Sequence, residues 1–106
     1  MSSSFRRFEM LLPVRYNDGS LIPDAVIGET IADLRTKFGA VSIETQLIHG
    51  VWTHDKQIFH DDLIRVYVDV SDTVQNRRYF EKFKQRLKKR FRQIDIWMTT
   101  YPIEAV

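Results

Sequence analysis

Apolar and polar residues alternate along four stretches of the chain, which is the pattern of strands with one covered face. The predicted strands span residues 8–15, 41–47, 63–70 and 94–101. Pro13 lies in the first stretch and has no N–H to donate, so we expect a bulge, a strand end or an unpaired position there. Turn-forming residues at 16–20 follow this strand, and Pro102 follows the last one.

Two other stretches repeat apolar residues at helical spacing. The first predicted helix has Pro23 in its first turn and ends at Gly39, a common C-terminal stop. Its apolar stripe consists of Ile27, Ile31, Leu34 and Phe38. The second helix follows three residues suited to N-capping, Ser71, Asp72 and Thr73. Its stripe consists of Phe80, Phe83, Leu87 and Phe91.

A long hairpin connects the two helices, because residues 41–70 contain two strands and no helical repeat. A two-residue turn at Asp55-Lys56 would place Trp52 opposite Phe59. Gly50 indicates a bulge in the outgoing strand. The hairpin is longer than the sheet needs, so we expect its tip to project.

The order strand, helix, hairpin, helix, strand predicts an α+β fold, the ferredoxin-like βαββαβ plait, with a four-stranded antiparallel sheet and both helices on one face. We expect residues 1–7 to be a disordered leader and residues 8–106 to form one domain. Glu9 and Arg65 should be close enough to pair, because strands one and three are neighbours in this fold.

The sheet face away from the helices carries apolar and aromatic residues among its charges, at Leu11, Leu63, Arg65, Tyr67, Trp97 and Tyr101. Tyr and Trp are favoured at interfaces, and such a patch is large for an uncovered face. Three interpretations remain open. The favoured one is a homodimer that self-associates through this face or through the long hairpin. The others are a small-ligand cleft with an unknown ligand and an ordinary exposed sheet.

Charge is unevenly distributed along this 106-residue chain of net charge +2. Residues 77–92 hold nine basic residues and one acid, about +8, which leaves about −6 for the rest. Nucleic-acid binding through Lys88, Lys89 and Arg92 is therefore an alternative. It is not favoured, because the sheet lacks the aromatic signature of RNA-recognition domains.

Candidate chemistry is sparse. The chain has no cysteine, which excludes disulfides and thiolate sites. No catalytic motif is recognisable, and the three histidines lack the regular spacing of metal ligands. A candidate polar site combines His49 with Glu44 and Asp69. We expect no metal, no cofactor and no membrane partner, and we expect a cytoplasmic protein without favouring an enzyme.

Several short segments resemble a pattern in small bacterial ferredoxin-like plait families of unknown function. The segments are Phe38-Gly39, Gly50-Val51-Trp52, Ile58 and Arg90-Phe91-Arg92-Gln93, so the resemblance spans residues 38–98. It implies the plait fold and a bacterial protein, and it adds no site. The strand order is also similar to that of dimeric α/β-barrel proteins, some of which are monooxygenase-like enzymes without a cofactor. A binding or assembly role is the favoured interpretation.

Overall fold

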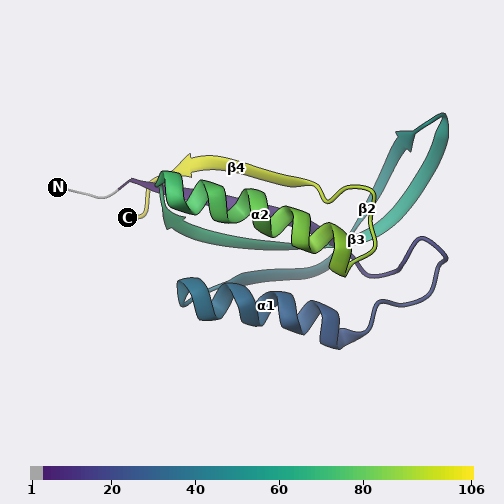
Figure 1. Ribbon diagram of the computed structural model, residues 1–106, viewed down its shortest axis with the longest axis horizontal. Coiled ribbons are helices and arrows are strands. Elements are labelled where there is room, and N and C mark those ends of the chain that lie inside the picture. Colours follow the sequence, from purple (N-terminus) through teal and green to yellow (C-terminus); the bar gives the residue numbers. More distant parts are fainter. Residues whose placement is uncertain (1–3) are drawn as a thin grey trace.

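The computed structural model describes residues 4–106. The elements are β1 (Phe5–Pro13), α1 (Asp24–Phe38), β2 (Ser42–His54), β3 (Gln57–Ser71), α2 (Val74–Arg90) and β4 (Met98–Ile103). The strands form one antiparallel sheet in the order β2-β3-β1-β4. Both helices lie side by side on one face of it (Figure 1). The predicted ferredoxin-like βαββαβ fold is therefore confirmed.

The core lies between this sheet and the two helices. All four residues of the predicted stripe on α2 are buried in it, as expected for an amphipathic helix. The sheet contributes the side chains that point toward the helices. The buried apolar residues are Phe8, Met10, Leu12, Ile22, Leu34, Ile64, Val66, Val68, Val70, Phe80, Phe83, Leu87, Phe91 and Ile96.

β1 begins earlier than the pattern predicted. Phe5 is already opposite Ser71 of β3 and Ile103 of β4, so part of the expected leader belongs to the sheet. Residues 1–3 lie outside the described residues. Pro13 is the last residue of β1, and the strand end was one of the three expectations for it.

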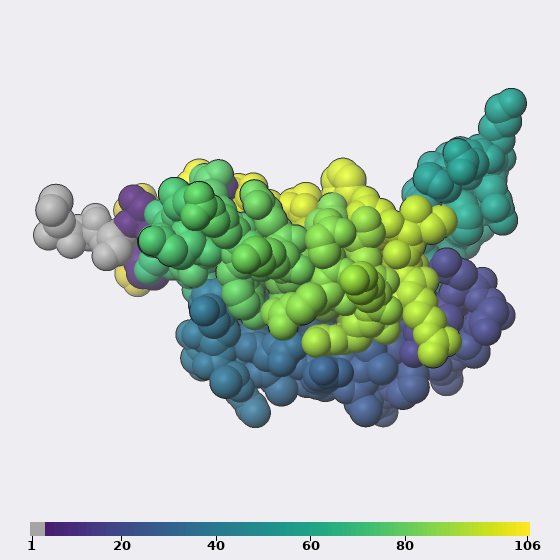
Figure 2. Space-filling view, viewed as in Figure 1, coloured from purple at the N-terminus to yellow at the C-terminus, as the bar shows by residue number. Residues whose placement is uncertain are grey.

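The hairpin of β2 and β3 extends past the helices and bends away from the body (Figures 1 and 2). Its turn at Asp55 and Lys56 has φ angles of 48° and 64°, as in a tight two-residue hairpin turn. Trp52 is opposite Phe59, as predicted. The bulge, however, lies between Glu44 and Ile48 instead of at the glycine.

β4 is displaced relative to the prediction of residues 94–101. Residues 94–97 connect α2 to β4, and the strand starts at Met98. The Asp95 carboxylate accepts a hydrogen bond from the Ile96 backbone N–H at 2.9 Å, which competes with sheet pairing. Pro102 lies inside β4 rather than after it, which is tolerated because β4 is an edge strand.

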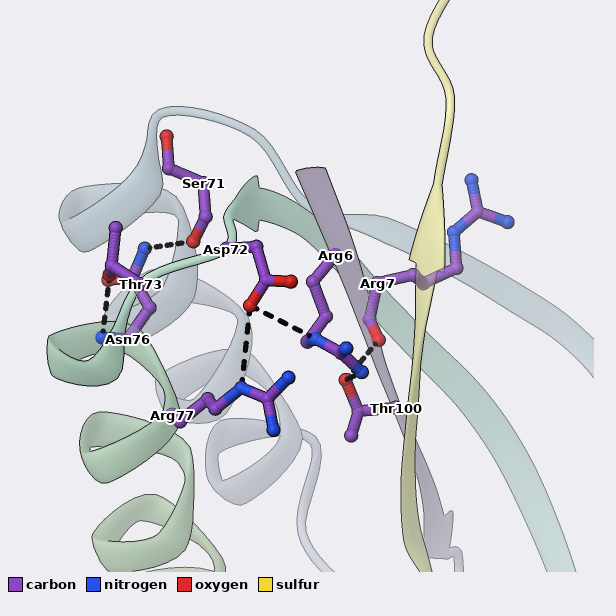
Figure 3. A network of polar contacts seen from close by, with 8 residues as sticks. All are labelled: Arg6, Arg7, Ser71, Asp72, Thr73, Asn76, Arg77 and Thr100. Atoms are coloured by element: carbon purple, nitrogen blue, oxygen red, sulfur yellow. Dashed lines mark hydrogen bonds and ion pairs between the residues drawn. The ribbon is translucent and has the colours of Figure 1, made fainter. Parts of the chain in front are cut away.

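A polar network fixes the start of α2 to the sheet (Figure 3). Thr73 caps the helix by accepting a hydrogen bond from the Asn76 backbone N–H at 3.1 Å. The Asp72 carboxylate accepts from Arg6 Nε of β1 at 3.2 Å and from Arg77 Nε of α2 at 3.4 Å. These hydrogen bonds, that from Arg6 above all, lower the pKa of Asp72.

Within residues 4–106, neither helix is both long and apolar enough to cross a membrane.

Candidate functional site: the open sheet face and its pocket

The sheet face opposite the helices, called the open face below, carries a charged pair between β1 and β3. Arg7 donates to both oxygens of Asp69, from Nε at 2.7 Å and from its terminal nitrogen at 3.0 Å. The same guanidinium lies 4.4 Å from the centre of the Tyr67 ring. Arg7 was not among the predicted site residues, because it fell in the expected leader.

A second group of charges crosses the middle of the open face. The predicted pairing of Glu9 with Arg65 is confirmed, with Arg65 Nε 3.8 Å from the carboxylate. Arg65 also reaches Glu44 on β2 at 3.5 Å. On the other side of Glu9, the Tyr101 hydroxyl donates to its carboxylate at 2.7 Å. This hydrogen bond raises the pKa of Tyr101, because deprotonation would set two negative charges side by side.

A pocket of about 420 Å³ lies farther along this face, where the hairpin bends. Leu11 of β1, Leu63 of β3 and Trp97, just before β4, all line it. These are three of the six predicted face residues. The other three, Arg65, Tyr67 and Tyr101, are outside the pocket lining and belong to the charged groups.

Trp52 and Asp61 of the hairpin are further pocket residues, and the sequence-based candidates omitted both. Trp52 stacks on Phe59 with ring centres 4.5 Å apart, and its Nε1 donates to Asp61 Oδ2 at 2.5 Å. The ring is therefore held in place on both sides. The predicted pairing of Trp52 with Phe59 was the signal that could have added Trp52 to the candidate residues.

Gly50 lies on β2 beside the pocket, opposite Asp61. A Cβ at this position would be 3.0 Å from Cδ1 of Leu63. The glycine therefore leaves room for Leu63, which would have to shift by a few tenths of an ångström to accept a larger residue. This close approach explains a glycine within a strand that is in regular register.

Trp97 contrasts with Trp52 because 66% of its surface is exposed. Its backbone is fixed, since its carbonyl accepts a hydrogen bond from the Leu11 N–H at 3.0 Å. An exposed indole on a fixed backbone beside a pocket is suited to contact with another molecule.

The three residues of the candidate polar site, His49, Glu44 and Asp69, do not lie together in the structure. Asp69 is bound by Arg7, and Glu44 lies beside Arg65. His49 is directly opposite Asp62, so its side chain is on the other face of the hairpin. The register places it near His60 instead.

The basic residues of α2 and the turn after it are partly engaged within the molecule. Arg90 pairs with Asp33 at 2.9 Å, and Lys84 pairs with Asp95 at 3.2 Å. The Arg92 guanidinium lies 4.8 Å from the centre of the Tyr16 ring. Lys88 and Lys89 form no ion pair with any residue in the described range 4–106.

Comparisons with known proteins identify the fold but no family. No family model matches the chain, and no curated protein matches it in sequence. A phage SAM lyase in complex with S-methyl-5′-thioadenosine has a TM-score of 0.67 and 15% identity, over 99% of this chain and 92% of that chain. The divalent cation tolerance protein CutA1 from Thermus thermophilus has a TM-score of 0.64 and 13% identity, over 96% and 86%.

The GlnK–ATP complex of B. subtilis is also similar, with a TM-score of 0.55 and 15% identity over 97% of this chain and 84% of that chain. At such identities the likeness shows a shared small ferredoxin-like fold and nothing about the site.

Proposed function

We propose that this chain is a binding and assembly domain that self-associates as a homodimer by covering its open face with a second copy. The observation that carries the proposal is the exposed Trp97 beside Leu11 and Leu63, on a fixed and largely apolar part of the sheet. An uncovered face of this composition would cost free energy in water.

The charges of the open face are compatible with contact between two copies. Arg7 and Arg65 stand against Glu9, Glu44 and Asp69, so the two signs nearly balance. Each charge already has a partner within its own chain. A second copy would therefore meet little net repulsion, and the pairs lose less on desolvation than isolated charges would.

The hairpin offers a second apolar surface, on the face opposite the open face. On its other face Val51 and Ile58 are exposed although both are β-branched and apolar. The hairpin projects beyond the helices (Figure 2), so these residues have no core of their own to pack against. They lie outside the proposed open-face interface.

The solution mass measured by light scattering over a wide concentration range tests this proposal. We expect twice the chain mass of 12.6 kDa at both low and high salt, because apolar contacts are little affected by screening. A mass of one chain at every concentration would remove the proposal. A dimer that dissociates at high salt would show that the interface is ionic and lies elsewhere.

The pocket supports a second candidate function, the binding of a small planar ligand. Trp52 and Trp97 offer aromatic surfaces, and Asp61 makes the lining acidic, whereas the charge of Asp95 is offset by Lys84. Two of the similar structures hold adenine compounds, S-methyl-5′-thioadenosine and ATP. Between these, the acidic lining favours the uncharged nucleoside over a triphosphate.

Calorimetric titration with these two compounds tests the second candidate. We expect saturable binding of S-methyl-5′-thioadenosine, no binding of ATP, and loss of binding in Trp97→Leu. Equal binding by the wild type and Trp97→Leu would refute the pocket as the site, and so would the absence of any heat. Catalysis is not part of this proposal.

Nucleic-acid binding has weaker support. Lys88 and Lys89 have no ion pair within residues 4–106, but Lys84 and Arg90 do. The free positive charge of α2 is therefore smaller than the sequence alone indicated.

A further inference from the structure

The outer half of the hairpin holds two histidines that the sequence separates by eleven positions. His49 of β2 is directly opposite Asp62 of β3, and His60 is opposite Val51, two residues farther along. His49 and His60 are therefore diagonal neighbours on one face of the hairpin, and their ring centres are 5.4 Å apart. Both side chains are exposed, on the segment that extends past the helices.

The contacts of His49 fix the roles of its two ring nitrogens. Its Nδ1 is 3.2 Å from Asp62 Oδ1. An ionised carboxylate only accepts hydrogen bonds, so in the neutral ring this contact favours the tautomer with the proton on Nδ1 and the lone pair on Nε2. This carboxylate–histidine arrangement is the one that orients and strengthens histidine ligands at metal centres.

The lone pair on His49 Nε2 faces His60 Nδ1, and the two nitrogens are 3.3 Å apart. Two imidazole nitrogens bound to one tetrahedral zinc ion at about 2.0–2.1 Å are separated by about 3.3–3.4 Å. The two nitrogens thus already have the separation of a chelating pair. In the neutral pair His60 Nδ1 donates to His49 Nε2, so metal binding requires the tautomer of His60 with its proton on Nε2 and a rotation of both exposed rings toward the ion.

We propose that His49 and His60 chelate a divalent transition-metal ion, with Asp62 as the residue that positions His49. Imidazole nitrogens suit Zn²⁺, Ni²⁺ and Cu²⁺, whereas Mg²⁺ and Ca²⁺ prefer oxygen ligands. Within residues 4–106, no group of three or more His, Cys, Asp or Glu side chains forms a metal site. The protein supplies two ligands, and water completes the coordination.

This inference revises the expectation that the chain binds no metal, and it is independent of the proposed self-association. The inference depends on the register of the hairpin. The spacing of 49 and 60 in the sequence matches no regular ligand motif, so only the pairing of β2 with β3 brings the two rings together.

Calorimetric titration of the whole chain with ZnCl₂ and NiCl₂, in a non-coordinating buffer near pH 7.5, tests the site. We expect saturable binding of both ions and none of Mg²⁺. His49→Gln and His60→Gln should each weaken Zn²⁺ binding by more than about tenfold, and Asp62→Asn by about tenfold at unchanged stoichiometry. All three positions are on an exposed hairpin, and far-UV circular dichroism checks the folding of each variant.

His54→Gln is the matched control, because His54 is on the same hairpin with its Nε2 3.2 Å from an oxygen of Asp55. This variant should bind zinc like the wild type. NMR gives a second readout, in which the ring signals of His49 and His60 shift with zinc and those of His54 do not. Wild-type binding no tighter than that of His49→Gln would overturn the proposal, as would loss of binding in His54→Gln.

Discussion

Replacing Trp97 by glutamate should separate the copies of this protein without unfolding them. Trp97 is 66% exposed in the single chain, so its indole adds little to the core. In the proposed dimer the same indole is buried, and a carboxylate in its place would be left without a partner. The substitution therefore acts on association and hardly on folding.

The size of the effect follows from the exposed surface. A tryptophan offers at most about 250 Å², and two thirds of it at about 25 cal/mol/Å² give about 4 kcal/mol per copy as an upper limit. Interfaces realise only part of this value, but a central tryptophan commonly contributes about 2 kcal/mol or more. A symmetric dimer loses the contact twice, so we expect the dissociation constant to rise by at least about 10³-fold.

Light scattering after size-exclusion chromatography measures this change at matched concentrations. Val74→Glu is the control, because Val74 is 60% exposed and lies at the start of α2, in the helical layer. A carboxylate is favourable there, at a helix N-terminus without an acidic residue in its first turn. We expect a monomer for Trp97→Glu and the wild-type mass for Val74→Glu.

Two results would refute this reasoning. One is a Trp97→Glu variant that is folded by circular dichroism and keeps the wild-type mass. The other is an equal loss of mass in Val74→Glu, which would show that any added negative charge disrupts the assembly.

Other perturbations test the fold that supports the site. Arg90→Met should lower the free energy of unfolding by about 2–3 kcal/mol in urea, because this 15%-exposed side chain holds Asp33 and the buried Thr30 of α1; equal stability would show that the contact contributes nothing. Asp72→Asn should make the stability fall less steeply with pH below about pH 4. The pKa of Asp72 is lowered on folding, so its carboxylate stabilises the protein at pH values above the ordinary pKa of 3.8, and this stabilisation is lost as the pH falls through the lowered pKa. The free energy of unfolding is measured by urea titration from about pH 6 to about 2.5, and the same pH dependence in the variant and the wild type would contradict this pKa shift. Gly39→Ala should destabilise by about 1 kcal/mol, because Gly39 has a φ of 84°, whereas Gly28→Ala within α1 should stabilise by about 0.5–1 kcal/mol; thermal unfolding distinguishes the two signs.

Local patterns were sufficient for the fold. The stripe of Phe80, Phe83 and Leu87 predicted α2 and its buried face, since helical periodicity places these side chains together whatever lies opposite. The turn at Asp55-Lys56 predicted the register of Trp52 with Phe59, because a two-residue turn leaves only one pairing.

The predicted strand bounds were wrong where a side chain takes a backbone hydrogen bond from the sheet, or where pairing with a distant strand determines how far a strand extends. Residues 94–97 alternate like a strand, but the Asp95 carboxylate takes the N–H of Ile96. Phe5 and Arg7 looked like a leader, yet β3 and β4 pair with them on both sides. Neither effect is visible in the periodicity of the segment itself.

The sequence by itself determined the order of elements, the buried stripe of the second helix and the aromatic character of the open face, because these depend on residues close together in the chain. Only the tertiary structure decided which distant groups meet. The bulge between Glu44 and Ile48 shifts the register of β2 on β3. The pairing outward of the bulge runs without a shift from Ile48 and Leu63 to the turn, and it sets Trp52 over the pocket and His49 beside His60 on the opposite face of the hairpin. A shift of one residue would exchange the two faces, because strand side chains alternate with a period of two.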